Sequence, residues 1–473
     1  MTRSFFLCLI SLAGAVAIAM SQQLKPQARF LTYEEARPLL QSLDEILPAE
    51  LKGKSAEEGA RGWPEWVKAQ DAAVRARLRR GDEDTMINFL LFGASFTRQP
   101  RVTAQELTGR RQAQEAFNQL INARIDDLIR ALTAPKAVAI NERLGFLRKL
   151  VAQQGHQLDD PKGRAKLREY LLAGLQRTLR EQESYAQALA AARSQGNPGE
   201  EFIERSKLYR TRGLSLDTAL APNFAIEESL KAMKSRGLIQ AGSVRKVAVI
   251  GPGLDFTDKA AGYDFYPEQT IQPFALIDSL ERLGLAKAGE SQLVAFDLSP
   301  RALDHLARAR GRAQRGLAYV VQLPHDPQAK WRPELLRYWE TFGDQIGKPA
   351  APVGAPAGLS ELKLRAVRVA PSVVARVRPV DLNIVYQRMA ERQNFDLIIA
   401  TNVLVYYDVF EQSLAMANIE SLLRPGGFLL SNNALLELPV SGMKSVDYLT
   451  VVYSDRPDDG DHIVWYQRAP ARQ

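Results

Sequence analysis

Cysteine and histidine are scarce in this chain of 473 residues. It contains one cysteine, Cys8, and four histidines, at His156, His305, His325 and His462. With a single thiol the chain can form no internal disulfide, and it lacks the cysteine pairs of a thiolate zinc site. No two histidines have a spacing typical of metal ligands. We therefore expect no metal centre and no cysteine nucleophile.

A strong charge imbalance is also missing. Apolar residues make up 46% of the chain and charged residues 25%, which are values typical of a globular protein. The net charge of +8 is small for this length, and neither a basic stripe with stacking aromatic residues nor a Cys/His finger accompanies it. These features argue against a nucleic-acid-binding protein. Binding to an acidic membrane surface or to an acidic substrate remains compatible with the charge.

Long apolar runs are absent except at the N-terminus. Arg3 precedes an apolar stretch over residues 5–20, with an Ala-Ile-Ala triplet at residues 17–19 before a polar segment. A basic start, a short apolar core and an Ala-x-Ala end are typical of a secretory signal peptide. An uncleaved signal anchor is the alternative, and it would attach the chain to a membrane. We predict that residues 1–20 are a signal peptide or signal anchor. The protein is then exported (periplasmic or extracellular) or membrane-anchored rather than cytoplasmic.

Residues 24–240 have the sequence pattern of an all-α domain. Apolar residues recur at three- and four-residue intervals, for example at Phe117, Ile121, Ile125 and Leu128. This spacing places them on one face of a helix. No motif in this region indicates catalysis or metal binding, so we predict a helical domain without visible chemistry of its own.

From residue 241 onward the pattern changes to alternating strands and helices. Val247–Ile250 and Gln292–Asp297 are short apolar runs typical of buried strands. More strand candidates follow near 317–321, 367–380 and 395–402, and again at 447–454 and 462–467. The last two are separated by a Pro-Asp-Asp-Gly turn, which indicates a hairpin. We predict an α/β domain over residues 241–473 with a mostly parallel sheet and an antiparallel C-terminal hairpin.

Residues 347–358 interrupt this alternation. They are rich in proline, alanine and glycine and show no hydrophobic periodicity. Such composition is typical of a linker or of an insertion at the surface. We therefore predict an exposed insertion in the α/β domain at this point.

Two polar features directly follow the first two predicted strands. Gly251-Pro252-Gly253 comes after the first strand, and Asp297 ends the second. Glycine lets backbone amides approach a ligand closely because it has no Cβ. An acid at the end of the next strand accepts hydrogen bonds from ribose hydroxyls in nucleotide-binding α/β folds. The sequence therefore predicts a nucleotide site at this edge of the sheet.

Further motifs make residues 240–470 resemble the class I S-adenosylmethionine-dependent methyltransferases. Residues 247–255 resemble the glycine-rich first motif, and residues 381–382 resemble the acidic-apolar pair beside the adenine. Residues 423–428, Leu-Arg-Pro-Gly-Gly-Phe, are similar to the Pro-Gly-Gly turn of that family. Among subfamilies, residues 402–407 are nearest to the chemotaxis-receptor-type methyltransferases, which also carry an N-terminal helical domain.

The resemblance implies a fold, a cofactor and a set of site residues. The implied fold is a Rossmann-like methyltransferase sheet preceded by an all-α N-terminal domain, and the implied cofactor is S-adenosylmethionine. The residues that would bind the cofactor are Gly251, Gly253, Asp255, Asp297, Asp381, Leu382 and Asn402. Tyr406 and Tyr407 would lie on the substrate side. The motifs identify neither a catalytic residue nor the methyl acceptor.

Two positions in the glycine motif depart from the family pattern. An acid usually stands two residues before the first glycine, where this chain has Val249, and Asp255 replaces a third glycine. An export signal would also take the chain away from the cytoplasm, where S-adenosylmethionine is made. The predicted function is therefore that of a methyltransferase with an unknown acceptor. The alternative is a non-catalytic methyltransferase-like binding or scaffolding module of an exported protein.

The predicted location can be tested independently of activity. Residues 1–30 fused to a reporter enzyme that is active only after export should give reporter activity, because the apolar segment would engage the export machinery. The matched control carries Ile10→Arg, which places a charge in the apolar core and should abolish the signal. Equal reporter activity from both fusions would contradict the prediction.

Overall fold

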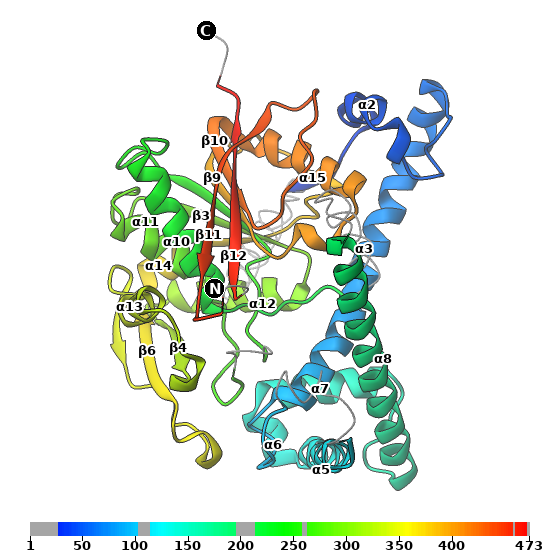
Figure 1. Cartoon of the computed structure of the whole chain (residues 1–473), viewed down its shortest axis with the longest axis vertical. Coiled ribbons are helices and arrows are strands. Elements are labelled where there is room, and N and C mark those ends of the chain that lie inside the picture. The colour runs from blue at the N-terminus through cyan, green and yellow to red at the C-terminus, as the bar shows by residue number, and fades with distance from the viewer. Residues whose placement is uncertain (1–26, 103–113, 195–212, 258–262, 457–458, 471–473) are drawn as a thin grey trace, which may run out of the picture.

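The computed structural model describes residues 27–102, 114–194, 213–257, 263–456 and 459–470 (Figure 1). The predicted signal segment, residues 1–20, lies outside these ranges. Figure 1 shows a helical half along one side of the molecule and an α/β half beside it. Among the described residues, no helix is both long and apolar enough to cross a membrane.

The helical half contains two long helices that lie side by side and a group of shorter ones at one end of them (Figure 1). Its helices are α2 (Tyr33–Ser42), α3 (Ala56–Phe92), α5 (Gln114–Thr133), α6 (Pro135–Ile140), α7 (Glu142–Gln153) and α8 (Pro161–Ser194). The predicted helical face is present, since Ile121, Ile125 and Leu128 are buried in α5. Both α2 and α3 begin at a capping box, formed by Thr32 with Glu35 in α2.

The central sheet of the α/β half has seven strands. They are β2 (Lys246–Ile250), β3 (Gln292–Asp297), β7 (Val377–Asp381), β9 (Phe395–Ala400), β10 (Leu423–Ser431), β11 (Met443–Val452) and β12 (Gly460–Arg468). Their order is β11-β12-β10-β9-β2-β3-β7. The strands from β10 to β7 pair in parallel, whereas β12 pairs antiparallel with both β10 and β11. The mostly parallel sheet with its antiparallel C-terminal hairpin is therefore confirmed.

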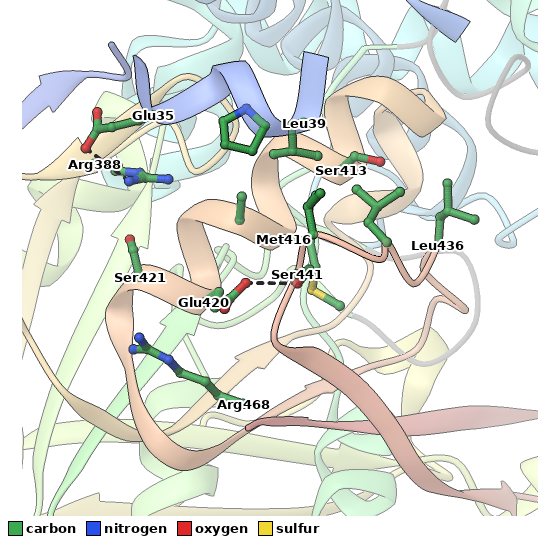
Figure 2. A pocket seen from close by; sticks show the side chains of 14 residues that line it. Glu35, Leu39, Arg388, Ser413, Met416, Glu420, Ser421, Leu436, Ser441 and Arg468 are labelled. Carbon is green, nitrogen blue, oxygen red and sulfur yellow. Dashed lines mark hydrogen bonds and ion pairs between the residues drawn. The ribbon is translucent and has the colours of Figure 1, made fainter. Parts of the chain in front are cut away.

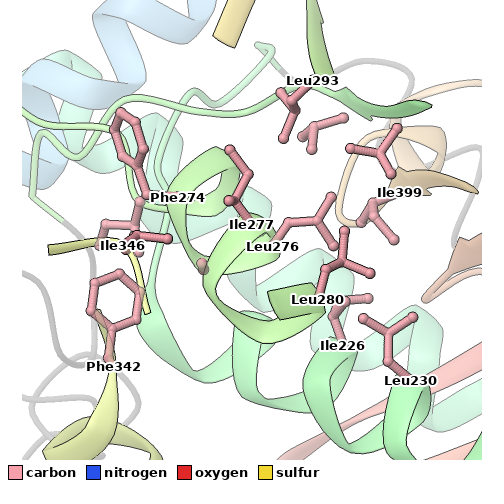
Figure 3. Close-up of a cluster of buried hydrophobic side chains, with 14 of the residues drawn as sticks. Ile226, Leu230, Phe274, Leu276, Ile277, Leu280, Leu293, Phe342, Ile346 and Ile399 are labelled. Atoms are coloured by element: carbon pink, nitrogen blue, oxygen red, sulfur yellow. The ribbon is translucent and has the colours of Figure 1, made fainter. Parts of the chain in front are cut away.

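Alternate residues of the strands face two separate hydrophobic cores. Val247 and Val249 of β2 point to one core, and Ala248 and Ile250 point to the other. Helices on the two faces are α10 (Leu220–Ser235), α11 (Gln272–Arg282), α12 (Pro300–Ala313), α13 (Pro333–Thr341), α14 (Pro371–Arg376) and α15 (Val409–Leu422). Figure 3 shows the first core, in which α10 and α11 cover the sheet with side chains such as Leu230.

The contacts of α10 bear on the predicted domain boundary. This helix precedes residue 240, yet its buried residues Phe224, Ile226 and Met233 belong to the core of the sheet. The domain boundary predicted between residues 240 and 241 would therefore separate α10 from the sheet against which it packs. Helix α3 also contributes to the second core through Trp63 and Val67.

The segment between α12 and β7 differs from the prediction. The strand expected near residues 317–321 is β4 (Tyr319–His325), and it pairs antiparallel with β6 (Lys363–Val369) outside the central sheet. The first residues of the predicted exposed insertion form β5 (Gly347–Ala350), which pairs with the other edge of β6. The expected extended run over residues 367–380 is divided by α14. Pairing with a distant strand, which no local pattern encodes, produces this three-stranded sheet.

The two halves are joined by strand pairing and by one buried cation. β1 (Ala28–Phe30) pairs antiparallel with β8 (Gln387–Met389). Arg143 of α7 is 1% exposed and donates hydrogen bonds to backbone carbonyl oxygens in the loop that follows β2. These oxygens belong to Asp255, Phe256, Asp264 and Tyr266. The guanidinium therefore fixes the loop after the glycine turn to the helical half.

Replacing Arg143 should destabilise the protein strongly. Arg143→Met keeps much of the side-chain volume but leaves several buried carbonyl oxygens without a donor, so we expect the free energy of unfolding to fall by about 3 kcal/mol or more. Urea unfolding followed by circular dichroism measures the change. Arg130→Met, at a side chain 75% exposed on α5, is the control and should change stability by less than about 0.5 kcal/mol. Similar losses in the two variants would contradict this role.

Candidate functional site

The carboxyl ends of β2, β3 and β9 border a cavity of about 80 Å³. Five of the seven predicted cofactor residues and both predicted substrate-side residues line it, namely Gly251, Gly253, Asp297, Leu382, Asn402, Tyr406 and Tyr407. A second cavity of about 100 Å³ is adjacent, since both are lined by Asp217, Gly251, Thr401 and Asn402. Ligands of open α/β sheets bind at this edge of the sheet.

The glycine turn makes contacts that only glycine permits. Gly251 and Gly253 have positive φ angles of 67° and 72°. A Cβ on Gly251 would lie 2.5 Å from Cγ2 of Val403, and one on Gly253 would lie 2.8 Å from the carbonyl oxygen of Leu216. The space beside the turn is therefore used by other parts of this chain.

Asp297 is the buried acid of the first cavity. Its Oδ1 accepts a hydrogen bond from the backbone N–H of Ser299 at 2.8 Å. Its Oδ2 is buried and has no hydrogen-bond partner among the described residues. Burial raises the pKa of this carboxyl group to about 6, although the Ser299 amide lowers it. An acceptor that lacks a partner at the end of β3 matches the need of a ribose hydroxyl donor.

Two predicted cofactor residues do not line the cavity. Asp255 is buried and accepts hydrogen bonds from the Tyr266 hydroxyl at 2.9 Å and from Gln269 Nε2 at 3.1 Å, so it closes the loop after the glycine turn. The Asp381 side chain is 54% exposed and forms an ion pair with Arg75 at 2.8 Å. Leu382, the next residue, turns inward instead and is buried at the cavity wall.

The residues after β9 form the other wall. Asn402 has a left-handed backbone with φ 57°, and its side chain accepts a hydrogen bond from Asn432 Nδ2 at 2.6 Å. The carbonyl oxygen of Tyr406 accepts from Arg77 Nη2 at 2.9 Å, which ties this wall to α3. Tyr407 is buried, and burial, followed by the charge of Glu411, raises the pKa of its hydroxyl group. A tyrosine of this kind stays protonated at neutral pH.

The helical half also contributes to the cavity, which the sequence motifs did not indicate. Leu78 of α3 and the segment Leu214–Asp217 line it. The backbone of this segment is held on both sides, because Leu214 N–H donates to the Arg77 carbonyl and Leu254 N–H donates to the Leu216 carbonyl. Thr401 is a further wall residue that was not predicted, although its position directly before Asn402 could have indicated it.

Val249, the departure from the usual acid, has a structural explanation. Its side chain is fully buried in the core beneath α11, in a strand flanked by β3 and β9. A carboxylate at this position would be buried among apolar groups, which is costly without a paired cation. A core residue therefore stands where the motif that the sequence resembles has an acid.

The residues present fit an adenosine-type cofactor in their chemistry. Asp297 has an acceptor oxygen without a partner among the described residues, Leu298 and Leu382 are apolar neighbours, and Gly251 provides a turn without a side chain. The two cavities of about 80 and 100 Å³ are small beside typical ligand pockets of about 300–1,000 Å³.

A larger cavity of about 230 Å³ lies elsewhere, between α2 and α15 (Figure 2). It contains none of the predicted site residues. Of the charged groups that Figure 2 shows there, Arg388 contacts Glu35 at 3.0 Å and Glu420 accepts a hydrogen bond from Ser441 Oγ at 2.9 Å. Among the described residues, no group of three or more acidic, histidine or cysteine side chains could hold a metal ion.

Strand order and the polar carboxyl edge define an α/β chain with a Rossmann-like sheet, consistent with the methyltransferase fold that the motifs predicted. No protein-family model and no curated protein matches the sequence.

Solved structures with similarity include several methyltransferases. The rRNA methyltransferase aviRa from Streptomyces viridochromogenes is 9% identical, with a TM-score of 0.26, and 55% of this chain and 92% of that chain are covered. Magnesium protoporphyrin IX methyltransferase from Synechocystis PCC 6803, with bound S-adenosylmethionine, is 9% identical with a TM-score of 0.24, covering 58% and 85%. TrmN from Thermus thermophilus is 12% identical with a TM-score of 0.24, covering 52% of each chain. Likeness at this level decides neither substrate nor activity.

The raised pKa of Asp297 predicts a pH effect on stability. In the folded protein the carboxyl group loses its proton at about pH 6, and in the unfolded chain it does so near its ordinary value of 3.8. The folded state therefore loses stability as the pH rises through this window. Asn does not titrate, so the melting temperature of Asp297→Asn minus that of the wild type should rise from about pH 4 to about pH 6 and then level off. A difference that does not change with pH would contradict the buried carboxylate.

Proposed function

We propose that this chain binds S-adenosylmethionine and transfers its methyl group to an acceptor. The observation that carries the proposal is Asp297, whose buried Oδ2 lacks a partner among the described residues at the strand end beside Gly251 and Gly253. The bound cofactor would supply an electrophilic methyl group on a sulfonium. The residues that would hold it are Asp297 at the ribose, Leu382 at the adenine, and Gly251 and Asn402 at the methionine part.

The role of the protein in such a transfer is mostly to position the reactants. Methyl transfer is an in-line displacement, so holding the nucleophile near the methyl group supplies much of the catalysis. The acidic side chains on the two cavities are Asp217 and Asp297, and no lysine or histidine among the described residues lines either cavity. An acceptor of low pKa, such as a carboxylate, needs no base to accept the methyl group. The chemotaxis-receptor-type methyltransferases, which residues 402–407 resemble, are carboxyl methyltransferases.

A non-catalytic binding or scaffolding module is the second candidate. The small volume of the two cavities and the segment Leu214–Asp217 across the glycine turn favour it. In that case the Rossmann-like sheet would serve as a support for the helical half. An exported or membrane-anchored location, proposed from residues 5–20, is compatible with either candidate.

Cofactor binding separates the two candidates. The full chain from residue 24 onward is required, because Leu78 and Leu214 from the helical half line the cavity. Isothermal titration with S-adenosylmethionine should detect binding, and Asp297→Asn should weaken it at least about tenfold, because the carboxylate that accepts from the ribose hydroxyls is lost.

The control for this measurement is Asp304→Asn, the same change at an exposed position on α12. It should bind the cofactor as the wild type does. If the wild type shows no heat of binding at millimolar cofactor, the methyltransferase proposal fails and the non-catalytic candidate is favoured.

A further inference from the structure

The cavity of about 230 Å³ between α2 and α15 has an apolar wall that opens at the surface (Figure 2). Leu39 of α2 and Met416 of α15 line it and are buried. Leu436 and Val440, from the loop between β10 and β11, line it as well and are 44% and 50% exposed. A concave apolar wall with a few polar groups is typical of small-molecule sites.

The charged groups on the α2 side of this cavity satisfy one another. Arg388 donates to Glu35 Oε1 at 3.0 Å and to Asn418 Oδ1 at 2.7 Å. Arg29 donates to the two carboxylate oxygens of Glu35 at 2.6 and 2.8 Å. The hydrogen bonds from Arg29, with a further effect of the Arg388 charge, lower the pKa of Glu35 to about 2. Glu35 is therefore ionised at neutral pH, and both of its oxygens accept hydrogen bonds.

Glu420, the other carboxylate of the cavity wall, also has partners for both oxygens. Its Oε2 accepts from Ser441 Oγ at 2.9 Å, and its Oε1 accepts from the Gly442 N–H at 3.0 Å. The Ser413 and Ser421 hydroxyls, which α15 presents to the cavity, donate to backbone carbonyl oxygens of the same helix. These polar groups are thus engaged within the protein.

Arg468 differs from the other charged residues of the cavity. It ends β12, and among the described residues it forms no ion pair. The one hydrogen bond it donates to a described residue goes to the carbonyl oxygen of Leu423. A guanidinium has five N–H donors in a planar fork, so most of them remain for a ligand. This fork matches a carboxylate, which it can bind through two parallel hydrogen bonds.

The size of the cavity limits the ligand. One water molecule has a share of about 30 Å³ in the liquid, so 230 Å³ has room for about eight groups of that size. Figure 2 shows Arg468 at one end of the cavity, apart from Leu39 and Leu436. A ligand that reaches both ends therefore has an anionic group at one end and an apolar chain at the other.

We propose that this cavity binds a monocarboxylate with an unbranched apolar chain of about eight carbon atoms, held by Arg468 at the carboxylate and by Leu39, Met416 and Leu436 along the chain. The site is distinct from the candidate cofactor site, since none of the described residues that line the two cavities at the glycine turn borders it. The proposal therefore adds a second binding function to the chain.

Three probes separate the contributions of charge and chain in titration calorimetry of the full chain from residue 24 onward. Octanoate should bind at least about tenfold more tightly than octanamide, because only the carboxylate forms a charge-assisted pair with Arg468. Acetate has the charge without the chain. It should also bind at least about tenfold more weakly than octanoate, because it buries little apolar surface.

Variants of the wall assign these effects to residues. Arg468→Gln should weaken octanoate at least about tenfold and leave octanamide within about twofold. Arg468→Lys keeps the charge without the fork and should retain more affinity for octanoate than the glutamine variant. The double change Leu436→Ser with Val440→Ser should weaken octanoate and octanamide alike, by about threefold or more, because both lose apolar contacts.

Controls separate a binding effect from a folding effect. Arg456→Gln, at a side chain 77% exposed, and Ile140→Ser, at a side chain 86% exposed on α6, are matched changes away from the cavity and should alter neither affinity. Because Arg468 also serves the Leu423 carbonyl, the melting temperature of each Arg468 variant is measured. Ala417→Phe provides an independent test, since it fills the cavity from α15 without changing a charge and should abolish octanoate binding.

The proposal is overturned if the wild type binds octanoate no more tightly than octanamide or shows no heat of binding at millimolar octanoate. Unchanged octanoate affinity in folded Arg468→Gln or in Ala417→Phe overturns it too, because binding would then occur elsewhere. The described walls of this site and of the candidate cofactor site share no residue. Failure here therefore leaves the proposed function standing, and a failure to bind S-adenosylmethionine leaves this proposal standing.

Discussion

The buried guanidinium of Arg143 is the contact on which the arrangement of the two halves depends. It is 1% exposed and is surrounded by four carbonyl oxygens of the loop after β2. Burying a cation costs free energy unless it donates hydrogen bonds, and burying a carbonyl group costs free energy unless it accepts one. If the Arg143 guanidinium and the loop separated, the buried donors and the buried carbonyl oxygens would both lose their hydrogen-bond partners. The loop and α7 are therefore held together. Phe256 of this loop also packs in the core of the helical half.

This attachment determines how the candidate site is built. Because the loop after β2 is fixed to the helical half, the glycine turn at its start lies close to α3 and to the segment Leu214–Asp217. Arg75 of α3 pairs with Asp381, and Arg77 donates to the Tyr406 carbonyl. The helical half therefore forms a wall of the cavity and is more than an appendage to the sheet.

Local patterns predicted part of this structure well. The apolar runs that became β2, β3 and β9, the C-terminal hairpin and the helical face around Ile125 are all encoded by residues adjacent in sequence. The prediction was incomplete where pairing is distant. β5 forms from the Pro/Ala/Gly-rich stretch because β6 provides a partner edge, and α10 joins the core of the sheet although its pattern is that of any amphipathic helix.

By itself the sequence determined the class of fold and the residues at the ends of the parallel strands, since alternating strands and helices predict a parallel sheet and each motif lies within a single loop. Gly251, Gly253, Asp297, Leu382 and Asn402 were therefore predicted at one edge of the sheet, and they line one cavity. Only the tertiary structure decided that Asp255 and Asp381 point elsewhere and that Asp217 lies beside the glycine turn. Packing between distant residues decides where a side chain at a strand end points. It also decides which segment from another part of the chain lies beside it. No local sequence pattern encodes such packing.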